Sequence, residues 1–474
     1  MNYLATIGLE VHVQLQTRTK MFCACRTDFG APPNTQVCPV CLGYPGALPV
    51  INQEAIRLTV MTGLMVGSRI NPRSKFDRKN YFYPDMPKNY QITQFDQPLC
   101  LGGAVAIDCQ GQSRTVRLTR IHLEEDVAKN MHVRDQSRVD FNRAGHPLME
   151  IVTEPDMHSP EEAFAFLLAL KQILVYGLIS PCNLEEGNLR CDVNCSVRPE
   201  AQATLGTKTE IKNMNTFKGV YQALTYELQR QVAALAAGER IVQETRRFDT
   251  DRGVTETMRT KEDAHDYRYF PDPDLMPVTL SAEQIEAWEG MLPELPHQRC
   301  ERLEHEYALP PYDAKVLSAD KYVADFFEAA ARGAANPKTV SNWIMTEMMH
   351  LLTEKELEIR QVKITPQALA GLIKLVESHA INAAGAKTIF ALLFDKGGDP
   401  AELVGQLGLA QVSDTGTLEA WVRQAIDGNP KSVSDYRSGK EASFKFLMGQ
   451  VMRLSKGKAN PQIAQDLLKK QLGV

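Results

Sequence analysis

The chain has 474 residues, of which 43% are hydrophobic and 23% charged, and a net charge of −5. This length suggests about three domains of ordinary globular composition, and the absence of any run of about 18 apolar residues excludes a membrane-spanning protein. Because the start MNYLATIGLEV lacks the features of a signal peptide, we expect a cytoplasmic protein whose ten cysteines are mostly thiols or metal ligands.

The first predicted element is a strand, IGLEVHVQLQT, over residues 7–17, because apolar and polar residues alternate with a period of two. Glu10 and His12 lie two positions apart and therefore share the polar face of this strand. A carboxylate beside an imidazole suits a metal ion, but it also suits an ordinary solvated sheet face. The strand alone leaves both interpretations open.

Four cysteines follow in the segment FCACRTDFGAPPNTQVCPVCLGYPG. Cys23 and Cys25 form a C-x-C pair, and Cys38 and Cys41 form a C-x-x-C pair beside turn-forming residues. Two such knuckles can bring four thiolates into a tetrahedron, which predicts a structural Zn²⁺ site. The alternatives are four buried free cysteines or a redox-active C-x-x-C.

Residues 78–94, RKNYFYPDMPKNYQITQ, combine cations with aromatic side chains in a loop pinned by two prolines. The cations are Arg78, Lys79 and Lys88, and the aromatic residues are Tyr81, Phe82, Tyr83 and Tyr90. This combination suits contact with phosphates and stacking on a base, although a surface loop packed by its own tyrosines is the alternative. Residues 260–277 show the same combination of cations, aromatic residues and prolines.

Carboxylates are spread over further predicted strands. Glu124, Glu125 and Asp126 lie in HLEEDVAKN, Asp192 in NLRCDVNCSVR and Glu210 in TKTEIKN. Together with Glu10 and His12 they form a set of oxygen ligands and one imidazole that favours Mg²⁺ or Mn²⁺ and hints at ATP chemistry. Any one of these acids alone is better explained as part of a solvated strand face, and Cys191 and Cys195 fall on the apolar phase of their strand.

The predicted organisation is an α+β fold with three domains. Residues 1–293 mix strands with helices over 161–178 and 219–237, residues 294–405 are all-α, and residues 406–474 form a small helical tail. Residues 431–474 contain nine Lys or Arg and three Asp or Glu, a net of +6, which leaves −11 for the rest. A basic tail on an acidic body suggests an anionic partner, with a solvated basic helix as the alternative.

Several long motifs carry a resemblance that extends over nearly the whole chain. They are GLEVHVQL, FGAPPNTQVCPVCLGYPGALP, RKNYFYPDMPKNYQITQ, LEEDVAK, DFNRAGHPLMEIVTEPD, EEGNLRCDVNCSVRP, KTEIKNMNTFKGV, HDYRYFPDPDL and GQVMRLSKGKANP. In these motifs the chain resembles the B subunits of the bacterial tRNA-dependent amidotransferase. The resemblance implies a mixed-sheet, cradle-like catalytic domain, an all-α domain and a small helical tail domain.

The resemblance also implies an activity and partners. Members of this family use ATP and Mg²⁺ to phosphorylate the side-chain carboxylate of Glu-tRNA(Gln) or Asp-tRNA(Asn), together with the amidase A and small C subunits, the first of which supplies ammonia. Carried onto this sequence, the site residues are Glu10, His12, Glu125, Asp192 and Glu210 for Mg²⁺, Lys79, Lys88 and Glu124 for catalysis, Arg78, Tyr81 and Tyr83 for the nucleotide, and the four cysteines for Zn²⁺.

Further hypotheses concern the route of ammonia and the basic tail. Residues 78–94 are expected at the exit of an ammonia route, because free ammonia must be kept from bulk water. The tail is expected to dock tRNA through backbone phosphates. Two other functions stay open at this point: a non-catalytic tRNA-binding scaffold, and a metal-dependent hydrolase with a zinc ribbon.

Overall fold

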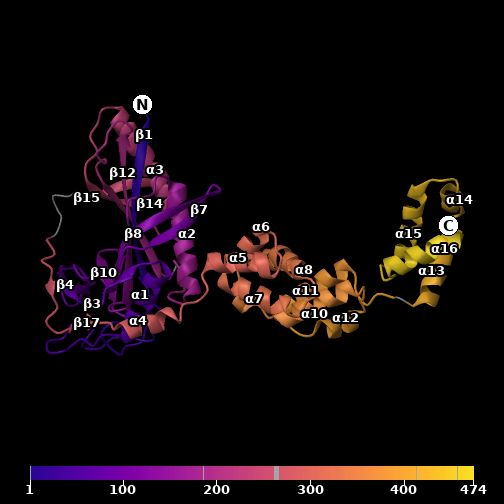
Figure 1. Cartoon of the computed structure of the whole chain (residues 1–474), viewed down its shortest axis with the longest axis horizontal. Helices are drawn as coiled ribbons and strands as arrows, with labels where there is room; N and C mark the ends of the chain where they lie inside the picture. Colours follow the sequence, from indigo (N-terminus) through magenta and orange to yellow (C-terminus); the bar gives the residue numbers. More distant parts are fainter. Residues whose placement is uncertain (1, 185, 261–265, 413, 456, 474) are drawn as a thin grey trace. The chain divides into compact units, whose positions relative to one another are not determined.

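The computed structural model describes residues 2–184, 186–260, 266–412, 414–455 and 457–473 (Figure 1). The chain forms two compact units, Met1–Pro296 and His297–Val474. Part of the predicted loop 260–277 and Lys456 of the basic tail lie outside the described residues. Within the described residues, no helix is both long and apolar enough to cross a bilayer.

The first unit is built around one large mixed sheet. In chain order it contains β1 (Tyr3–Gln14), α1 (Gln53–Met65), β2 (Arg69–Ile70), β3 (Arg73–Ser74), β4 (Asp77–Asn80), β5 (Tyr90–Thr93), β6 (Cys100–Leu101), β7 (Ala104–Cys109), β8 (Gln112–Glu125), β9 (Lys129–Val133), β10 (Gln136–Asp140), β11 (Pro147–Thr153), α2 (Pro160–Tyr176), β12 (Leu189–Pro199), β13 (Thr209–Lys212), α3 (Phe217–Ala236), β14 (Glu244–Asp249), β15 (Val254–Thr260), β16 (Phe270–Pro271), β17 (Val278–Thr279) and α4 (Ala282–Glu289). Ten strands form the sheet, in the order β15-β14-β13-β12-β1-β11-β8-β6-β2, with β7 paired to β8. Only β13 and β14 run parallel among these pairs.

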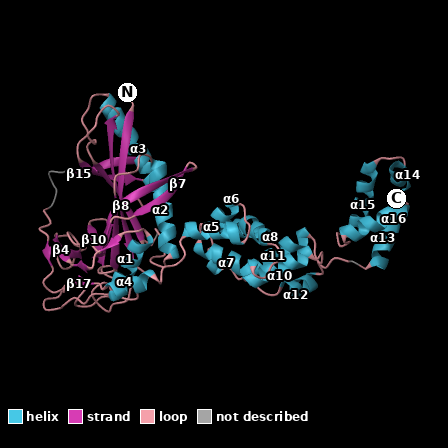
Figure 2. Ribbon diagram, viewed as in Figure 1, coloured by secondary structure: helices cyan, strands magenta, loops and turns pink. Residues whose placement is uncertain are grey.

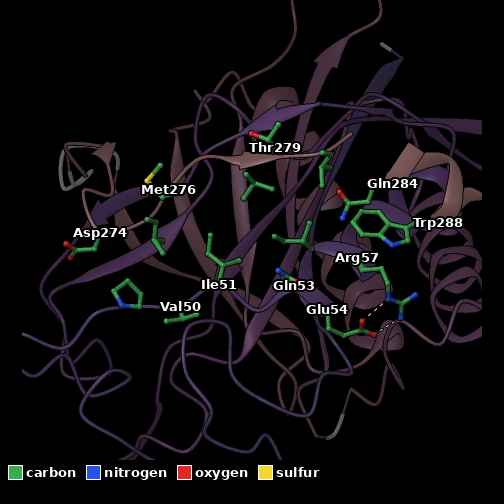
Figure 3. Close-up of a pocket in the computed structure, with 15 residues that line it drawn as sticks. Val50, Ile51, Gln53, Glu54, Arg57, Asp274, Met276, Thr279, Gln284 and Trp288 are labelled. Carbon is green, nitrogen blue, oxygen red and sulfur yellow. Dashed lines mark hydrogen bonds and ion pairs between the residues drawn. The ribbon is translucent and has the colours of Figure 1, made fainter. Parts of the chain in front are cut away.

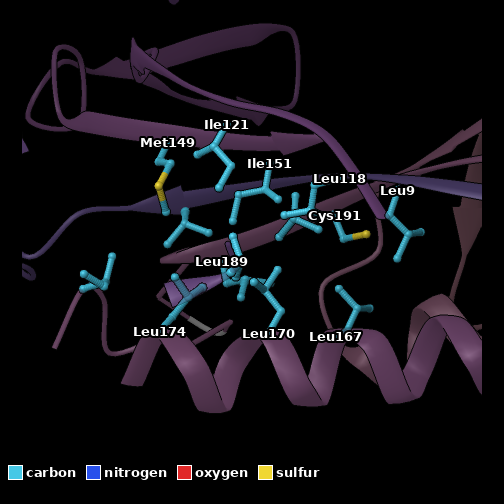
Figure 4. Packing of buried hydrophobic residues seen from close by; sticks show 14 of the residues in the cluster. Leu9, Leu118, Ile121, Met149, Ile151, Leu167, Leu170, Leu174, Leu189 and Cys191 are labelled. Atoms are coloured by element: carbon cyan, nitrogen blue, oxygen red, sulfur yellow. The ribbon is translucent and has the colours of Figure 1, made fainter. Parts of the chain in front are cut away.

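The sheet has one apolar and one polar face in its centre, because each strand alternates between the two. On the apolar face, Leu167, Leu170 and Leu174 of α2 pack against residues of the central strands, such as Leu9 and Ile151 (Figure 4). Helix α2 also contacts α3, and α3 contacts β12, so both helices cover this side. The helices therefore bury the apolar side and leave the other side of the sheet for polar residues.

The second unit is helical, as Figure 2 shows. Its elements are α5 (Pro296–Glu306), α6 (Pro311–Ser318), α7 (Lys321–Ala331), α8 (Pro337–Trp343), a π-helical turn (Ile344–Met348), α9 (Met349–Glu354), a 3₁₀ turn (Ile359–Gln361), α10 (Pro366–Glu377), α11 (Ala383–Lys396), α12 (Pro400–Leu407), α13 (Thr415–Asp427), α14 (Pro430–Arg437), α15 (Glu441–Leu454) and α16 (Pro461–Leu472). Two separate hydrophobic clusters lie in this unit, one between Leu303 and Val404 and one between Leu418 and Leu472.

The structure confirms the α+β class with a mixed-sheet first part and a helical second part. The strand predicted over 7–17 is observed over Tyr3–Gln14, and the helix predicted from Glu161 begins at Pro160, where the Ser159 side chain accepts a hydrogen bond from the backbone of Glu162. Cys191 and Cys195 are buried in the core, as expected. The division into three domains at residues 293 and 405 stays a prediction.

Candidate active site

The polar face of the central sheet gathers side chains from five neighbouring strands. Strand registers place Arg190, His12, Glu150 and His122 in one row across β12, β1, β11 and β8. Asp192 and Glu10 lie opposite each other on β12 and β1, and Lys212 of β13 binds Asp192. Since residues directly opposite each other lie about 5 Å apart in antiparallel strands, these pairings bring acids and bases from distant parts of the sequence into contact.

His12, Glu124 and Glu150 form the tightest part of this face. His12 Nε2 lies 3.2 Å from a carboxylate oxygen of Glu150 and 3.8 Å from one of Glu124. One ligand atom from each of the three lies within 4.8 Å of the others. Neighbouring ligands of an octahedral Mg²⁺ with bonds of about 2.1 Å lie about 3.0 Å apart, so small movements of these side chains would bring all three to one ion.

Burial and mutual charge perturb the pKa of each member of this group. Burial and the charge of Glu150 raise the pKa of Glu124. Burial works against ionisation of Glu150 too, but the adjacent histidines lower its pKa below the usual range. For His12, burial is outweighed by the hydrogen bond to Glu150 and by the charge of Glu124, so its pKa is raised. Groups poised in this way are typical of functional sites.

Lys79 brings a positive charge to the group. It lies on β4, and burial of its ammonium is outweighed by the charges of Glu124 and of the tyrosines Tyr267 and Tyr269, so that its pKa is raised. Its Nζ lies 5.0 Å from the centre of the Tyr267 ring. A cation that lies over an aromatic ring, near the charge of Glu124, can also attract an anionic ligand.

The structure gives the other residues of loop 78–94 different surroundings. Arg78 binds Asp272 and Asp274 at 2.8 and 2.9 Å, so its guanidinium already has two carboxylate partners. The Tyr81 ring packs edge-on against Tyr267. Tyr83 is half exposed and Phe82 is almost fully exposed.

Glu10, Asp192 and Glu210 lie on the same face but toward β13. Lys212 binds Asp192 at 2.5 Å and Glu210 at 3.2 Å, while Glu10 accepts a hydrogen bond from Asn194 at 2.9 Å. Burial and the charge of Glu150 raise the pKa of Glu10. These three acids therefore extend the carboxylate face beyond the His12 group.

Glu125 lies elsewhere, because successive residues of a strand point to opposite faces. Its carboxylate pairs with Lys88 and accepts a hydrogen bond from the backbone of Ile92 at 3.0 Å. Glu124, its neighbour, takes the position beside His12. Glu125 was expected from the sequence among the Mg²⁺ ligands, whereas in the structure Glu124, not Glu125, lies beside His12. The identity of the Mg²⁺ ligands stays a prediction.

Asp126, the third acid of HLEEDVAKN, is buried in an ion pair. Arg190 binds it at 2.8 Å, Arg143 lies at 3.8 Å, and the Gln14 side chain donates to it at 2.8 Å. Burial opposes its ionisation, but the two arginines lower its pKa to about 2. The pair fixes Arg190 directly beside His12 in the row described above.

The four cysteines converge as expected. One sulfur from each lies within 4.8 Å of the others, and the sulfurs of Cys38 and Cys41 are 3.9 Å apart. Tetrahedral Zn²⁺ with bonds of about 2.3 Å requires sulfurs about 3.8 Å apart, so the group fits zinc. A hydrogen bond from the Cys23 thiol lowers the pKa of Cys41 and raises that of Cys23.

A groove of about 730 Å³ lies apart from these residues, between α1, α4 and the segment before β17 (Figure 3). Trp288 and Gln284 of α4 line it opposite Arg57 of α1, which binds Glu54. None of the predicted site residues lines it.

Comparisons with known proteins identify the family. The sequence profile described as the GatB/GatE catalytic domain matches residues 5–286, and the profile described as the GatB domain matches residues 325–472. The chain belongs to the GatB family. It is 51% identical to the B subunit of the aspartyl/glutamyl-tRNA(Asn/Gln) amidotransferase of Caldanaerobacter subterraneus subsp. tengcongensis, and 50% identical to that of Thermoanaerobacter pseudethanolicus, over all of both chains in each case. The protein of this name from Methylacidiphilum infernorum is 51% identical over all of this chain and 99% of its own.

Two members of the polar face of this GatB chain escaped prediction from the sequence. Glu150 is the acid in the otherwise apolar strand PLMEIVT, and His122 lies in the apolar end of TVRLTRIHL. A polar residue within an apolar stretch of strand is the signal that could have found both, because it marks the strand's polar face.

Proposed function

We propose that this chain is the B subunit of an ATP-dependent amidotransferase that acts in translation in the cytoplasm. It phosphorylates the side-chain carboxylate of Glu-tRNA(Gln) or Asp-tRNA(Asn), in a heterotrimer with the amidase A and small C subunits. The observation that carries the proposal is the convergence of His12, Glu124 and Glu150 beside Lys79. Full-length similarity to proteins named as B subunits of such an amidotransferase supports it.

The chemistry explains why acids and a lysine gather on one face. An oxygen of the side-chain carboxylate of the aminoacyl-tRNA attacks the γ-phosphorus of ATP, and ADP leaves. Ammonia then adds to the carbonyl carbon of the acyl phosphate, and phosphate leaves. His12, Glu124 and Glu150 would hold the Mg²⁺, which neutralises the phosphates of the nucleotide, and Glu10, Asp192 and Glu210 flank them. Lys79 offsets further negative charge on the transferred group. The four cysteines would hold a structural Zn²⁺.

The decisive experiment uses the reconstituted three-subunit complex with Glu-tRNA(Gln) and Asp-tRNA(Asn) assayed separately. Glu150→Gln removes one charged ligand and should lower tRNA-dependent ATP turnover about 100-fold or more, while tRNA binding stays close to wild type. Glu301→Gln, on the exposed side of α5, is the matched control. Unchanged ATP turnover in Glu150→Gln would leave the non-catalytic scaffold as the better interpretation.

The route of ammonia and the basic tail belong to the same proposal. Lys88, paired with Glu125, is expected at the end of the ammonia route, so Lys88→Ala should lower glutamine-dependent amidation.

Replacing the exposed Lys445, Lys469 and Lys470 with Gln should flatten the salt dependence of tRNA binding, by up to about 0.7–0.9 in the logarithmic slope for each phosphate that is no longer bound. An unchanged slope would count against the tail.

A further inference from the structure

Lys20 is a fully buried lysine at the four-cysteine site. Its exposed fraction is 0%, and it is among the largest side chains that are completely buried in the protein. Its Nζ lies 3.6 Å from the sulfur of Cys41 and 3.1 Å from the carbonyl oxygen of Phe141. The lysine therefore reaches the C-x-x-C knuckle from inside the protein.

The backbone of Lys20 is tied to the other knuckle. Its N–H donates to the carbonyl oxygen of Cys25 at 2.9 Å, and the next residue, Met21, donates to Gly145 at 2.7 Å. The side chain of Asn52 donates to the carbonyl oxygen of Lys20 at 3.3 Å. One residue thus joins the C-x-C knuckle through its backbone and the C-x-x-C knuckle through its side chain.

No carboxylate balances this ammonium among the residues that the structure describes. Glu125, the carboxylate that lines the same small cavity, is paired with Lys88. Burying an ammonium without an opposite charge costs several kcal/mol, and neither a neutral thiol nor one carbonyl oxygen offsets that cost. The position of Lys20 therefore requires negative charge at the cysteines.

Metal binding creates that charge, because the four cysteines bind the ion as deprotonated thiolates. Four thiolates around one divalent ion leave a net charge of about −2, and a buried site of this charge is stabilised by a neighbouring cation and by N–H···S hydrogen bonds. We propose that Lys20 is the buried counter-cation of the four-cysteine metal site, and that its hydrogen bond to the Cys41 thiolate helps to retain the zinc. This inference rests on the zinc site proposed above.

The test measures zinc release from the full chain in its assembled complex. Zinc content is determined first, and the rate of zinc transfer to an excess of a chelating dye is then followed for wild type and Lys20→Met. Because partners of metal ligands typically contribute 10–100-fold to metal affinity, the variant should release zinc about 10–100 times faster. Lys20→Gln, which keeps an N–H donor without the charge, should fall between the two and serves if Lys20→Met does not fold.

Arg26→Gln is the matched control. Arg26 follows the ligand Cys25 directly but its side chain is 75% exposed and bound to Asp28, so solvent already screens its charge. Zinc release from this variant should stay within about twofold of wild type. Equal acceleration in Arg26→Gln and Lys20→Met would overturn the specific role of Lys20.

Thermal unfolding separates a role toward the metal from mere packing. Lys20→Met should lower the melting temperature more in zinc-loaded protein than after the zinc has been removed. The reason is that the negative charge that Lys20 balances is largest when the metal and four thiolates are present. The same loss with and without zinc, or unchanged zinc release, would overturn the inference while leaving the zinc site intact. Wild-type protein that holds no zinc would instead overturn the zinc site itself.

Discussion

Asp126 offers a prediction whose size follows from the structure. Its pKa is lowered from the ordinary 3.8 to about 2, since Arg190 and Arg143 outweigh its burial. At about 1.4 kcal/mol per pH unit, this shift contributes about 2.5 kcal/mol to the free energy of unfolding at pH 7. Breaking a buried ion pair typically costs 3–5 kcal/mol, but Arg190 is 35% exposed and can be partly solvated, so we expect Asp126→Asn to lose about 3 kcal/mol.

The pH dependence of this loss has a definite sign. A carboxylate with a lowered pKa contributes stability above its unfolded value and loses it as the pH falls through the folded value, so the contribution of Asp126 should shrink to about 1.3 kcal/mol at pH 3. Amide hydrogen exchange in peptides from β1 and β12, corrected for the intrinsic pH dependence, measures the opening free energy of this sheet within the full chain.

Asp156→Asn provides the matched control for Asp126→Asn. It removes the same charge from a more exposed pair with Arg117, at 2.7 Å, and should cost less than about 1 kcal/mol. A loss below about 1 kcal/mol for Asp126→Asn at pH 7, or equal losses at pH 7 and pH 3, would refute the reasoning from the buried pair.

Three other changes test the core, the tail and the cysteine site. Leu170→Ala should lower the opening free energy of the sheet by about 2–5 kcal/mol, measured by hydrogen exchange, whereas Leu168→Ala, at the 40% exposed neighbour, should change it by less than about 1 kcal/mol. Gly449→Ala should raise the opening free energy of α15 by about 0.5–1 kcal/mol and so slow its amide exchange, because a Cβ there meets nothing within 4 Å and alanine favours the helix. Faster exchange would contradict this. Cys38→Ser should reduce the zinc content measured by atomic emission, and full retention would show that Cys38 is not a ligand.

Much of the fold could be predicted because its signals are local. The alternation in IGLEVHVQLQT placed Glu10 and His12 on one face, and Ser159 followed by Pro160 marked the start of α2. The C-x-C and C-x-x-C pairs likewise predicted the four-cysteine cluster that the structure contains. Each of these features is decided within a few residues of sequence.

The partners of His12 were not local, since they depend on strand register. An unbroken alternation from the buried Val116 and Leu118 would have placed Glu125, not Glu124, on the polar face of β8. The structure has a register shift there: Val152 pairs with Arg120 but Thr153 pairs with Leu118, which leaves Thr119 without a direct partner and reverses the phase of the strand. Neither this bulge nor the pairing of Glu150 with His12 is encoded by spacing along the chain.

The bulge at Thr119 also limits how this strand can change in length. Deleting Thr119 would restore an unbroken pleat and exchange the faces of Glu124 and Glu125, so that His12 would lose Glu124 and Lys88 would lose Glu125. Insertions at the β7–β8 turn, around residues 110–111, fall on the other side of the bulge and leave the pairing of residues 120–125 with β11 unchanged. We therefore expect natural length variation to be tolerated at that turn and to be rejected between residues 119 and 125.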